Sequence, residues 1–272
     1  MIHDVCKDIM FNLGINRFIE TGTFVGETVA CVSEWLQDTA FGLVYSKESD
    51  EFLASFFPKR KIYYPKFRDA KIDADTKIYS VDTDKKRQEA LSRIFSSNPN
   101  VRFFRGSSEN FIKQAIDSGL IGDKDRCFFY LDAHEKRKSP LRQEIREILR
   151  LKRVVIVVDD FLVPFRPMHL FDVYESGVCG WYYIRDLFGG RKTEVYYPRK
   201  SNIDFRGTGI IFVGYDKKDL RFMDNLACFR QKVFKGDPFT TLLATGIFWL
   251  LKALPLPSES YAFWNKLQRR QV

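Results

Sequence analysis

The stretch RFIETGTFVGETVACV, from Arg17 to Val32, places a strand pattern, a turn with two glycines and a helix pattern in direct succession. RFIE has the apolar character of a buried strand, and residues 27–36 repeat apolar side chains at helical spacing. Between them, Gly22 and Gly26 let the backbone turn tightly and approach a ligand closely. The N–H groups at the start of the following helix point to the same place. The stretch therefore predicts a ligand-binding turn, although glycine in such a turn also occurs as a simple structural convenience.

The alternation of strand and helix patterns continues as far as residue 161. Further strand patterns occupy residues 77–82, 100–106, 126–132 and 153–160, with helix patterns at 84–95, 109–119 and 139–151. The last of these strands, RVVIVVDD, is apolar on both faces, as is typical inside a parallel sheet. Residues 193–197 and 207–215 predict two more strands, an antiparallel pair at one edge. The sequence therefore predicts a doubly wound, Rossmann-like α/β fold, with a mostly parallel seven-stranded sheet and helices on both faces.

The chain has 272 residues, of which 45% are hydrophobic, so it can bury one large core. We expect a single domain over residues 1–272, with an insertion at 37–76 after the first helix and a C-terminal helical extension at 217–272. The insertion interleaves basic and aromatic residues, which suits recognition of phosphates and rings but also occurs in solvated loops. The extension mixes Lys and Arg with Trp and Phe, and core packing explains this better than docking to a membrane or a partner.

Charge and cysteine content indicate which partners and which cellular location are expected for the protein. The formal net charge of +9 favours anionic partners, but it is equally typical of an ordinary basic protein. The five cysteines are scattered without a CxxC pair, which indicates reduced, buried thiols and a cytoplasmic location. The longest apolar stretch, residues 242–251, is about half of a membrane span, so we expect no transmembrane segment. Nucleic acid is a second, less favoured partner, and the sequence allows a homo-oligomer.

Ligands of doubly wound sheets bind beyond the carboxyl ends of the strands, so the residues after each strand are the candidates for a site. After the first three strands these are Glu20, Gly22, Thr23, Gly26, Asp82, Ser107 and Ser108. Asp82 can accept hydrogen bonds from both hydroxyls of a ribose, or it can cap the next helix. The two serines can contact the edge of a base, or they can cap the helix that follows them.

Ionisable residues also follow the fourth and fifth strands. Asp132 and His134 stand in LDAHEK, and Asp159 and Asp160 stand in VVDDF. Charges at the end of so apolar a strand are costly to bury without a cation, and carboxylate oxygens suit Mg²⁺. The sequence therefore predicts a magnesium site built from Asp132, Asp159 and Asp160. In the alternative interpretation one aspartate caps a helix, another pairs with Arg or Lys, and none binds metal.

Five segments, taken in order, resemble the class I S-adenosylmethionine (SAM)-dependent methyltransferases. They are FIETGTFVGET, IYSVDTD, VRFFRGSSENF, FFYLDAHEKRKSPLRQEI and VVIVVDDF, and they span residues 17–161. Within that superfamily, LDAH…SPL…E and VDD are similar to the macrocin O-methyltransferase-like enzymes, and Asp…Asp-Asp is similar to catechol O-methyltransferase. The sequence departs from the family pattern at Phe24, where a glycine is common, and in the length of its insertion.

The resemblance implies which part of the cofactor each candidate residue would bind. The first turn, with Glu20, Gly22 and Gly26, would hold the amino-acid end of SAM. Asp82 would hold the ribose, and Ser107 and Ser108 would lie near the adenine. In the metal-dependent relatives, acids after the fourth and fifth strands bind the ion.

The resemblance also implies an activity, an O-methyltransferase assisted by Mg²⁺ that acts on a hydroxyl of a small molecule or of a sugar or glycan intermediate. Asp132 or His134 would accept the proton of that hydroxyl, or His134 would only support Asp132. Methylation of RNA or protein is an alternative activity, and a non-catalytic binding subunit is an alternative of another class. The acceptor would bind near residues 164–190, whose aromatic residues otherwise form a packing layer.

Overall fold

The computed structural model describes residues 2–36, 76–133, 139–164, 166, 169–199, 206–226, 228–230 and 246. Of the expected insertion at 37–76, only Thr76 lies within the described residues. His134 and most of the expected C-terminal extension also lie outside them.

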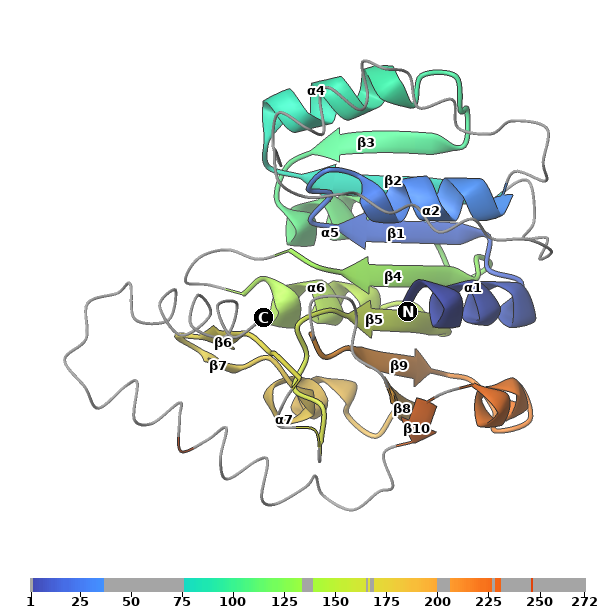
Figure 1. Cartoon of the computed structure of the whole chain (residues 1–272), viewed down its shortest axis with the longest axis vertical. Coiled ribbons are helices and arrows are strands. Elements are labelled where there is room, and N and C mark those ends of the chain that lie inside the picture. The colour runs from blue at the N-terminus through green and yellow to red at the C-terminus, as the bar shows by residue number, and fades with distance from the viewer. Residues whose placement is uncertain are drawn as a thin grey trace.

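One twisted sheet forms the centre of the described structure (Figure 1). Its strands lie in the order β10-β8-β9-β5-β4-β1-β2-β3. They are β1 Arg17–Thr21, β2 Lys77–Asp82, β3 Val101–Arg105, β4 Cys127–Leu131, β5 Val154–Val158, β8 Thr193–Pro198, β9 Gly209–Val213 and β10 Cys228–Arg230. The five strands β1 to β5, which lie side by side in the order β5-β4-β1-β2-β3, pair in parallel. In contrast, β9, β8 and β10 are antiparallel to their neighbours. The predicted seven-stranded, mostly parallel sheet is confirmed, and the short β10 extends it at one edge.

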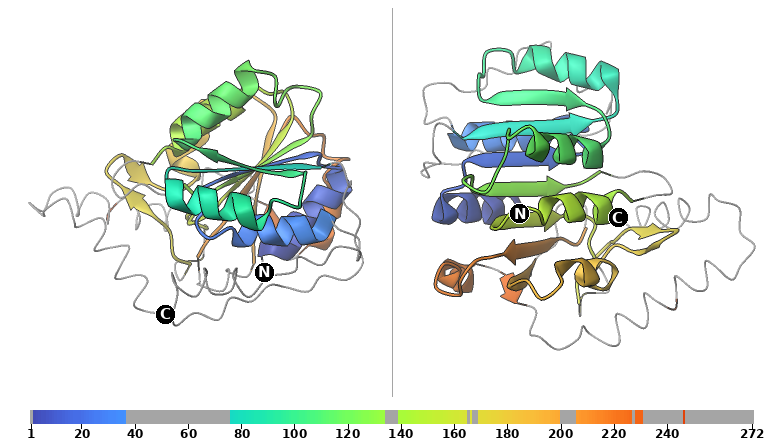
Figure 2. Two further views of the ribbon diagram at one scale, coloured as in Figure 1. Left: turned by 90° about the horizontal axis from the view of Figure 1, so that it is seen from above. Right: turned by 180° about the vertical axis from the view of Figure 1, so that it is seen from behind.

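Helices cover both faces of the sheet (Figure 2). On one face lie α1 Ile2–Leu13, α2 Glu27–Leu36 and α4 Lys85–Ile94, and on the other lie α5 Ser108–Asp117 and α6 Leu141–Ile148. The chain from β5 to β8 adds the hairpin of β6 Val173–Tyr174 and β7 Gly177–Val178, then α7 Trp181–Ile184 and η1 Arg185–Phe188. A second 3₁₀ helix, η2 Arg221–Asn225, precedes β10. The sequence patterns do not predict these short elements.

Successive side chains of the central strands alternate between the two helical layers. Phe18 of β1 and Phe128 of β4 belong to the core beneath α1, α2 and α4, and their rings stack with centroids 5.5 Å apart. Ile19 and Phe129, the next residues along the same strands, belong to the core beneath α5 and α6. All four side chains are fully buried, so these strands must be apolar on both faces.

The register of the parallel strands brings their carboxyl ends level with one another. Thr21 pairs with Val81 of β2 and with Leu131 of β4, and Leu131 pairs with Val158 of β5. The turns that follow these strands therefore open at the same edge of the sheet. Most of the predicted site residues within the described ranges stand in or beside the turns at this edge.

The cysteines agree with the expectation from the sequence. All five cysteines are free and buried. Burial raises the pKa of the Cys127 thiol to about 12, so it stays protonated and packs as a core residue. Within the described ranges, no helix has both the length and the apolar composition that a membrane span requires.

Candidate functional site

A cavity of about 370 Å³ opens at the carboxyl ends of the parallel strands. This volume lies in the range of small-molecule sites, roughly 300–1,000 Å³. The cavity is lined by Gly22, Phe24, Val81, Asp82, Thr83, Arg87, Gly106, Ser107, Ser108, Asp132, Ala133, Pro140 and Arg206. Among the predicted site residues, it thus brings together Gly22, Asp82, Ser107, Ser108 and Asp132.

At Gly22 the cavity is lined by main chain alone. The φ angle of Gly22 is 83°, in the left-handed region, and its N–H donates a hydrogen bond to the Val81 carbonyl at 3.0 Å. A Cβ atom at this position would lie 2.3 Å from the carbonyl oxygen of Asp132, which is sterically impossible without a backbone shift. The turn after β1 therefore lies directly against the turn after β4, and only glycine fits between them.

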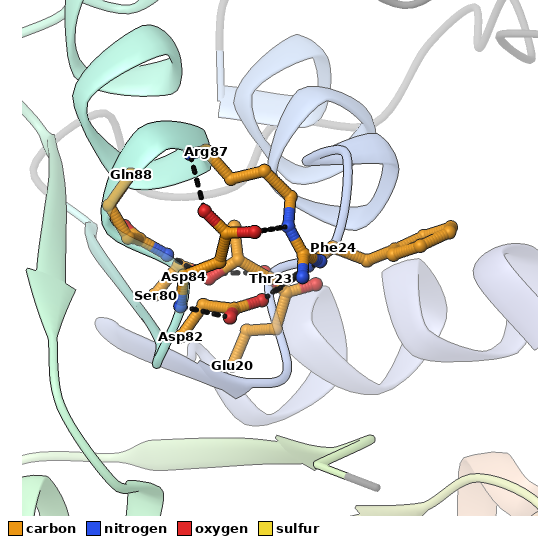
Figure 3. A network of polar contacts seen from close by, with 8 residues as sticks. All are labelled: Glu20, Thr23, Phe24, Ser80, Asp82, Asp84, Arg87 and Gln88. Carbon is orange, nitrogen blue, oxygen red and sulfur yellow. Dashed lines mark hydrogen bonds and ion pairs between the residues drawn. The ribbon is translucent and has the colours of Figure 1, made fainter. Parts of the chain in front are cut away.

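A chain of buried hydrogen bonds lies beneath this turn (Figure 3). Gln88 Nε2 donates to Thr23 Oγ1 at 2.7 Å, and Ser80 Oγ donates to Glu20 Oε2 at 2.5 Å. The Thr23 and Ser80 hydroxyl oxygens are 2.7 Å apart. Because Ser80 directs its one proton to Glu20, the Thr23 hydroxyl must donate to Ser80. The chain therefore runs in one direction, from α4 through the turn and β2 to the Glu20 carboxyl group on β1.

Glu20, Thr23 and Gly26 are not among the residues that line the cavity. The side chains of Glu20 and Thr23 are each only 2% exposed. Gly26 has a φ of 77°, and a Cβ there would lie 3.0 Å from Leu91 Cδ2 in α4. The structure thus places these residues where they support the turn, and their direct contact with a cofactor stays a prediction.

Asp82 ends β2 on the cavity wall, and its carboxylate is held by its neighbours. Its Oδ1 accepts a hydrogen bond from the Asp84 N–H at 2.9 Å, and its Oδ2 accepts one from the Phe24 N–H at 3.1 Å. Arg87 Nη1 lies 3.4 Å from the same Oδ2. The cap of α4 is Asp84, which accepts from the Arg87 N–H at 3.0 Å, so capping does not explain Asp82. A carboxylate has about four acceptor sites, which leaves room for a ligand hydroxyl.

Ser107 presents a hydroxyl that the described residues leave unpartnered. It is the N-cap residue of α5, but its side chain makes no capping hydrogen bond. Its buried Oγ has no hydrogen-bond partner in the described part of the chain, and the residue lines the cavity. Ser108 differs, since its Oγ lies 3.4 Å from Glu109 Oε2. Leaving a buried hydroxyl without a partner costs about 1–3 kcal/mol, a cost that a polar ligand atom would remove.

The predicted magnesium site is not supported by the described residues. Asp132 lines the cavity, but the Asp160 carboxylate is paired with the Arg206 guanidinium. Asp159 accepts a hydrogen bond from Thr208 Oγ1 at 3.2 Å. Nowhere in the described ranges are three His, Cys, Asp or Glu side chains placed to hold one metal ion. The positive charge that buried Asp160 requires comes from an arginine, as the alternative interpretation expects.

Tyr174 and Trp181, two aromatic residues of the segment after β5, pack into the structure and do not line this cavity, whereas Tyr182 is exposed. Tyr174 is buried, and its hydroxyl donates to Asp172 Oδ2 at 3.1 Å. Trp181 packs against Phe188 with ring centroids 5.1 Å apart. For these two residues the structure therefore supports the interpretation as a packing layer and not the interpretation as an acceptor site.

Several cavity residues, among them Phe24, Arg87 and Arg206, were not candidates for the site on sequence grounds. The signal for Arg87 is its position in the first turn of the helix that follows Asp82. Phe24 is visible in the sequence only as a departure from the family's glycine. Arg206 precedes β9 and gives no signal, because it does not follow a parallel strand.

No protein-family model matches the sequence, and no curated protein matches it. An O-methyltransferase from Bacillus cereus, solved with SAH, superposes with a TM-score of 0.46 at 12% identity, over 78% of this chain and 80% of that chain. The O-methyltransferase TomG from Streptomyces achromogenes, solved with SAM, gives 0.48 at 13% identity, over 79% and 80%. An rRNA methylase from Streptococcus thermophilus gives 0.40 at 13% identity, over 78% and 96%. These identities and TM-scores are low, so the superpositions by themselves assign no family and no activity to this chain. The macrocin-like resemblance stays a prediction.

Glu20 should make the stability of the protein depend on pH. Burial raises the pKa of Glu20 from 4.5 to about 8, against the opposing effect of hydrogen bonds from Ser80 and Thr28. Between these two values the folded protein keeps a proton that the unfolded chain releases. The free energy of unfolding therefore falls as the pH rises, by up to about 1.4 kcal/mol per pH unit. The side chain of Glu20→Gln cannot titrate. In urea unfolding from pH 5 to 8, the free energy of unfolding of this variant should therefore rise relative to that of the wild type.

The exposed Glu89 of α4 provides the matched control for this experiment. Glu89→Gln should follow the wild-type pH dependence. If the curves of Glu20→Gln and wild type ran parallel over this range, the raised pKa of Glu20 would be wrong.

Proposed function

We propose that the protein is a SAM-dependent O-methyltransferase that acts on a hydroxyl of a small molecule or of a sugar intermediate. One observation carries the proposal: a single cavity at the carboxyl ends of β1 to β4 joins the Asp82 carboxylate, the Ser107 hydroxyl and the bare turn at Gly22. These groups suit the ribose, the adenine and the amino-acid end of SAM, which are the roles that the family resemblance implies for them.

The carboxylate proposed for the ribose is held in place before any ligand binds. Each oxygen of the Asp82 carboxylate accepts a backbone N–H, from Asp84 or from Phe24, so the carboxylate has a fixed direction. The Ser107 hydroxyl can both donate and accept, which suits the edge of an adenine. Fixed polar groups lose little conformational entropy on binding, which favours affinity.

Bound SAM would supply an activated methyl group on a sulfonium, so the tasks left to the protein are to align the acceptor and remove its proton. Alignment of reacting groups can lower a barrier by as much as roughly 7–11 kcal/mol. Asp132 lines the cavity just after β4, and its backbone N–H donates to the Thr21 carbonyl at 3.0 Å. From there its carboxylate would take the proton of the acceptor hydroxyl. His134, the other predicted base, lies outside the described residues.

The proposal assigns no step to a metal ion. The Asp160 carboxylate already has a cationic partner in Arg206, which lines the cavity. The donor set formed by Asp132, Asp159 and Asp160 therefore does not fit magnesium in the described structure.

Calorimetric titration with S-adenosylhomocysteine (SAH) tests the cofactor. The wild type should bind SAH, and Asp82→Asn should bind it about tenfold or more weakly, because hydrogen bonds to a charged group are among the stronger ones. Asp117→Asn is the control, since Asp117 is an exposed acid on α5 that does not line the cavity. A wild type that fails to bind SAH would favour the non-catalytic alternative, and normal binding by Asp82→Asn would remove Asp82 from the site.

Transfer of a labelled methyl group tests the acceptor class. The protein is incubated with methyl-labelled SAM and a cell extract divided into small molecules, RNA and protein. We expect label in the small-molecule fraction and a loss of at least about 100-fold in Asp132→Asn, because a positioned base contributes about 10²–10⁴. SAH binding by that variant should persist. Label in RNA or protein would contradict the proposed acceptor and support the alternative activity.

A further inference from the structure

Phe24 is held in an unfavourable backbone conformation at the cavity. Its φ angle is 46°, in the left-handed region that glycine adopts freely and other residues avoid. Its side chain lines the cavity and is 46% exposed, whereas most large hydrophobic side chains of the described residues are buried. A strained residue at a ligand-sized cavity is an observation from which a function can be inferred.

Asp82 holds the backbone of Phe24, and Arg87 contacts its ring (Figure 3). The Phe24 N–H donates to Asp82 Oδ2 at 3.1 Å. The guanidinium carbon of Arg87 lies 5.6 Å from the centroid of the Phe24 ring, within the range of a cation–π contact. Arg87 is itself held by Asp82 at 3.4 Å and by Asp84 at 3.0 Å. The position of the ring is thus linked to the carboxylate that we assign to the ribose.

We propose that the Phe24 ring covers the nucleoside of the bound ligand and that Arg87 is the residue that positions the ring. The inference rests on the proposed function, because it takes the cavity to hold a nucleoside. A glycine would suit the turn better, but it would offer no surface to the ligand. An aromatic ring packs on a nucleoside of any base and keeps water from it, which strengthens the polar contacts beneath.

The inference predicts which part of the ligand depends on Phe24. A ring over the ribose and adenine contributes equally to every ligand that carries them. It does not depend on the amino-acid end, which we assign to the turn at Gly22. SAH and 5′-methylthioadenosine share the nucleoside and the sulfur, and only SAH has the amino acid. The two ligands therefore separate a nucleoside cover from a contact with the amino-acid end.

The test is calorimetric titration of the full chain with each ligand, together with thermal unfolding. Phe24→Gly should weaken the binding of both ligands by the same factor, about tenfold or more. Its Tm should stay within about 2–4 °C of the wild type or rise, because glycine relieves the strained backbone. Phe24→Tyr keeps the ring and should bind both ligands as the wild type does.

Two further variants serve as controls. Phe11 of α1 is 52% exposed and does not line the cavity, so Phe11→Ala should bind both ligands normally. Arg87→Gln removes the cation that faces the ring and should weaken binding. The double variant Arg87→Gln/Phe24→Gly should lose less affinity than the product of the two single fold-losses, because the effects of residues in contact are not independent.

The outcomes separate this inference from the proposed function. A wild type that binds neither ligand would contradict the proposed function. A wild type that binds both, with Phe24→Gly binding them equally well, would overturn only the role of Phe24. If Phe24→Gly lost affinity for SAH alone, the ring would lie at the amino-acid end of the ligand. A large fall in the Tm of Phe24→Gly would mean that the ring serves to stabilise the fold. Either result would also overturn the inference.

Discussion

The contact between the turn after β1 and the turn after β4 is the constraint on which the site depends. The space between them leaves no room for a Cβ at Gly22, which would lie 2.3 Å from the Asp132 carbonyl oxygen. The Asp132 N–H also donates to the Thr21 carbonyl at 3.0 Å. Because β1 and β4 pair in parallel and in register, the sheet itself sets this contact. It keeps the Asp132 carboxylate, the proposed base, beside the bare main chain that would receive the cofactor.

Two polar networks keep the β1 turn rigid from different sides. Beneath it, the buried chain from Gln88 through Thr23 and Ser80 ends at Glu20. Beside it, Asp82 binds the Phe24 N–H and orients Arg87. A site whose groups are fixed by their own supporting contacts is better suited to precise alignment than one on a free loop. The same rigidity explains how the strained conformation of Phe24 can persist.

The sheet and one edge of the site could be predicted from the sequence because they follow from local patterns. The apolar runs of β4 and β5 indicate strands buried on both faces, and parallel strands end at one edge. That logic placed Gly22, Asp82 and Asp132 on one cavity. The same logic also named Glu20, which does not line the cavity. The period of two in a strand puts Glu20 on the same face as Phe18, beneath the helices. The alternation within β1 was the available signal.

The charge partners could not be predicted, because they depend on contacts between distant segments. Arg206 and Asp160 are 46 residues apart, and nothing local links them. The acids after β4 and β5 therefore suggested a metal site, whereas the folded chain supplies a guanidinium to one of them. The cation–π contact of Arg87 with Phe24 likewise depends on how the first turn of α4 faces the glycine turn.

The crystal structure of the wild-type protein with SAH tests the central claim most directly. The account predicts at least one ribose hydroxyl within hydrogen-bond distance of the Asp82 carboxylate, at roughly 2.5–3.2 Å, and the adenine beside the Ser107 hydroxyl. It would be contradicted by a ribose bound away from Asp82, or by a cavity that stays empty at saturating SAH.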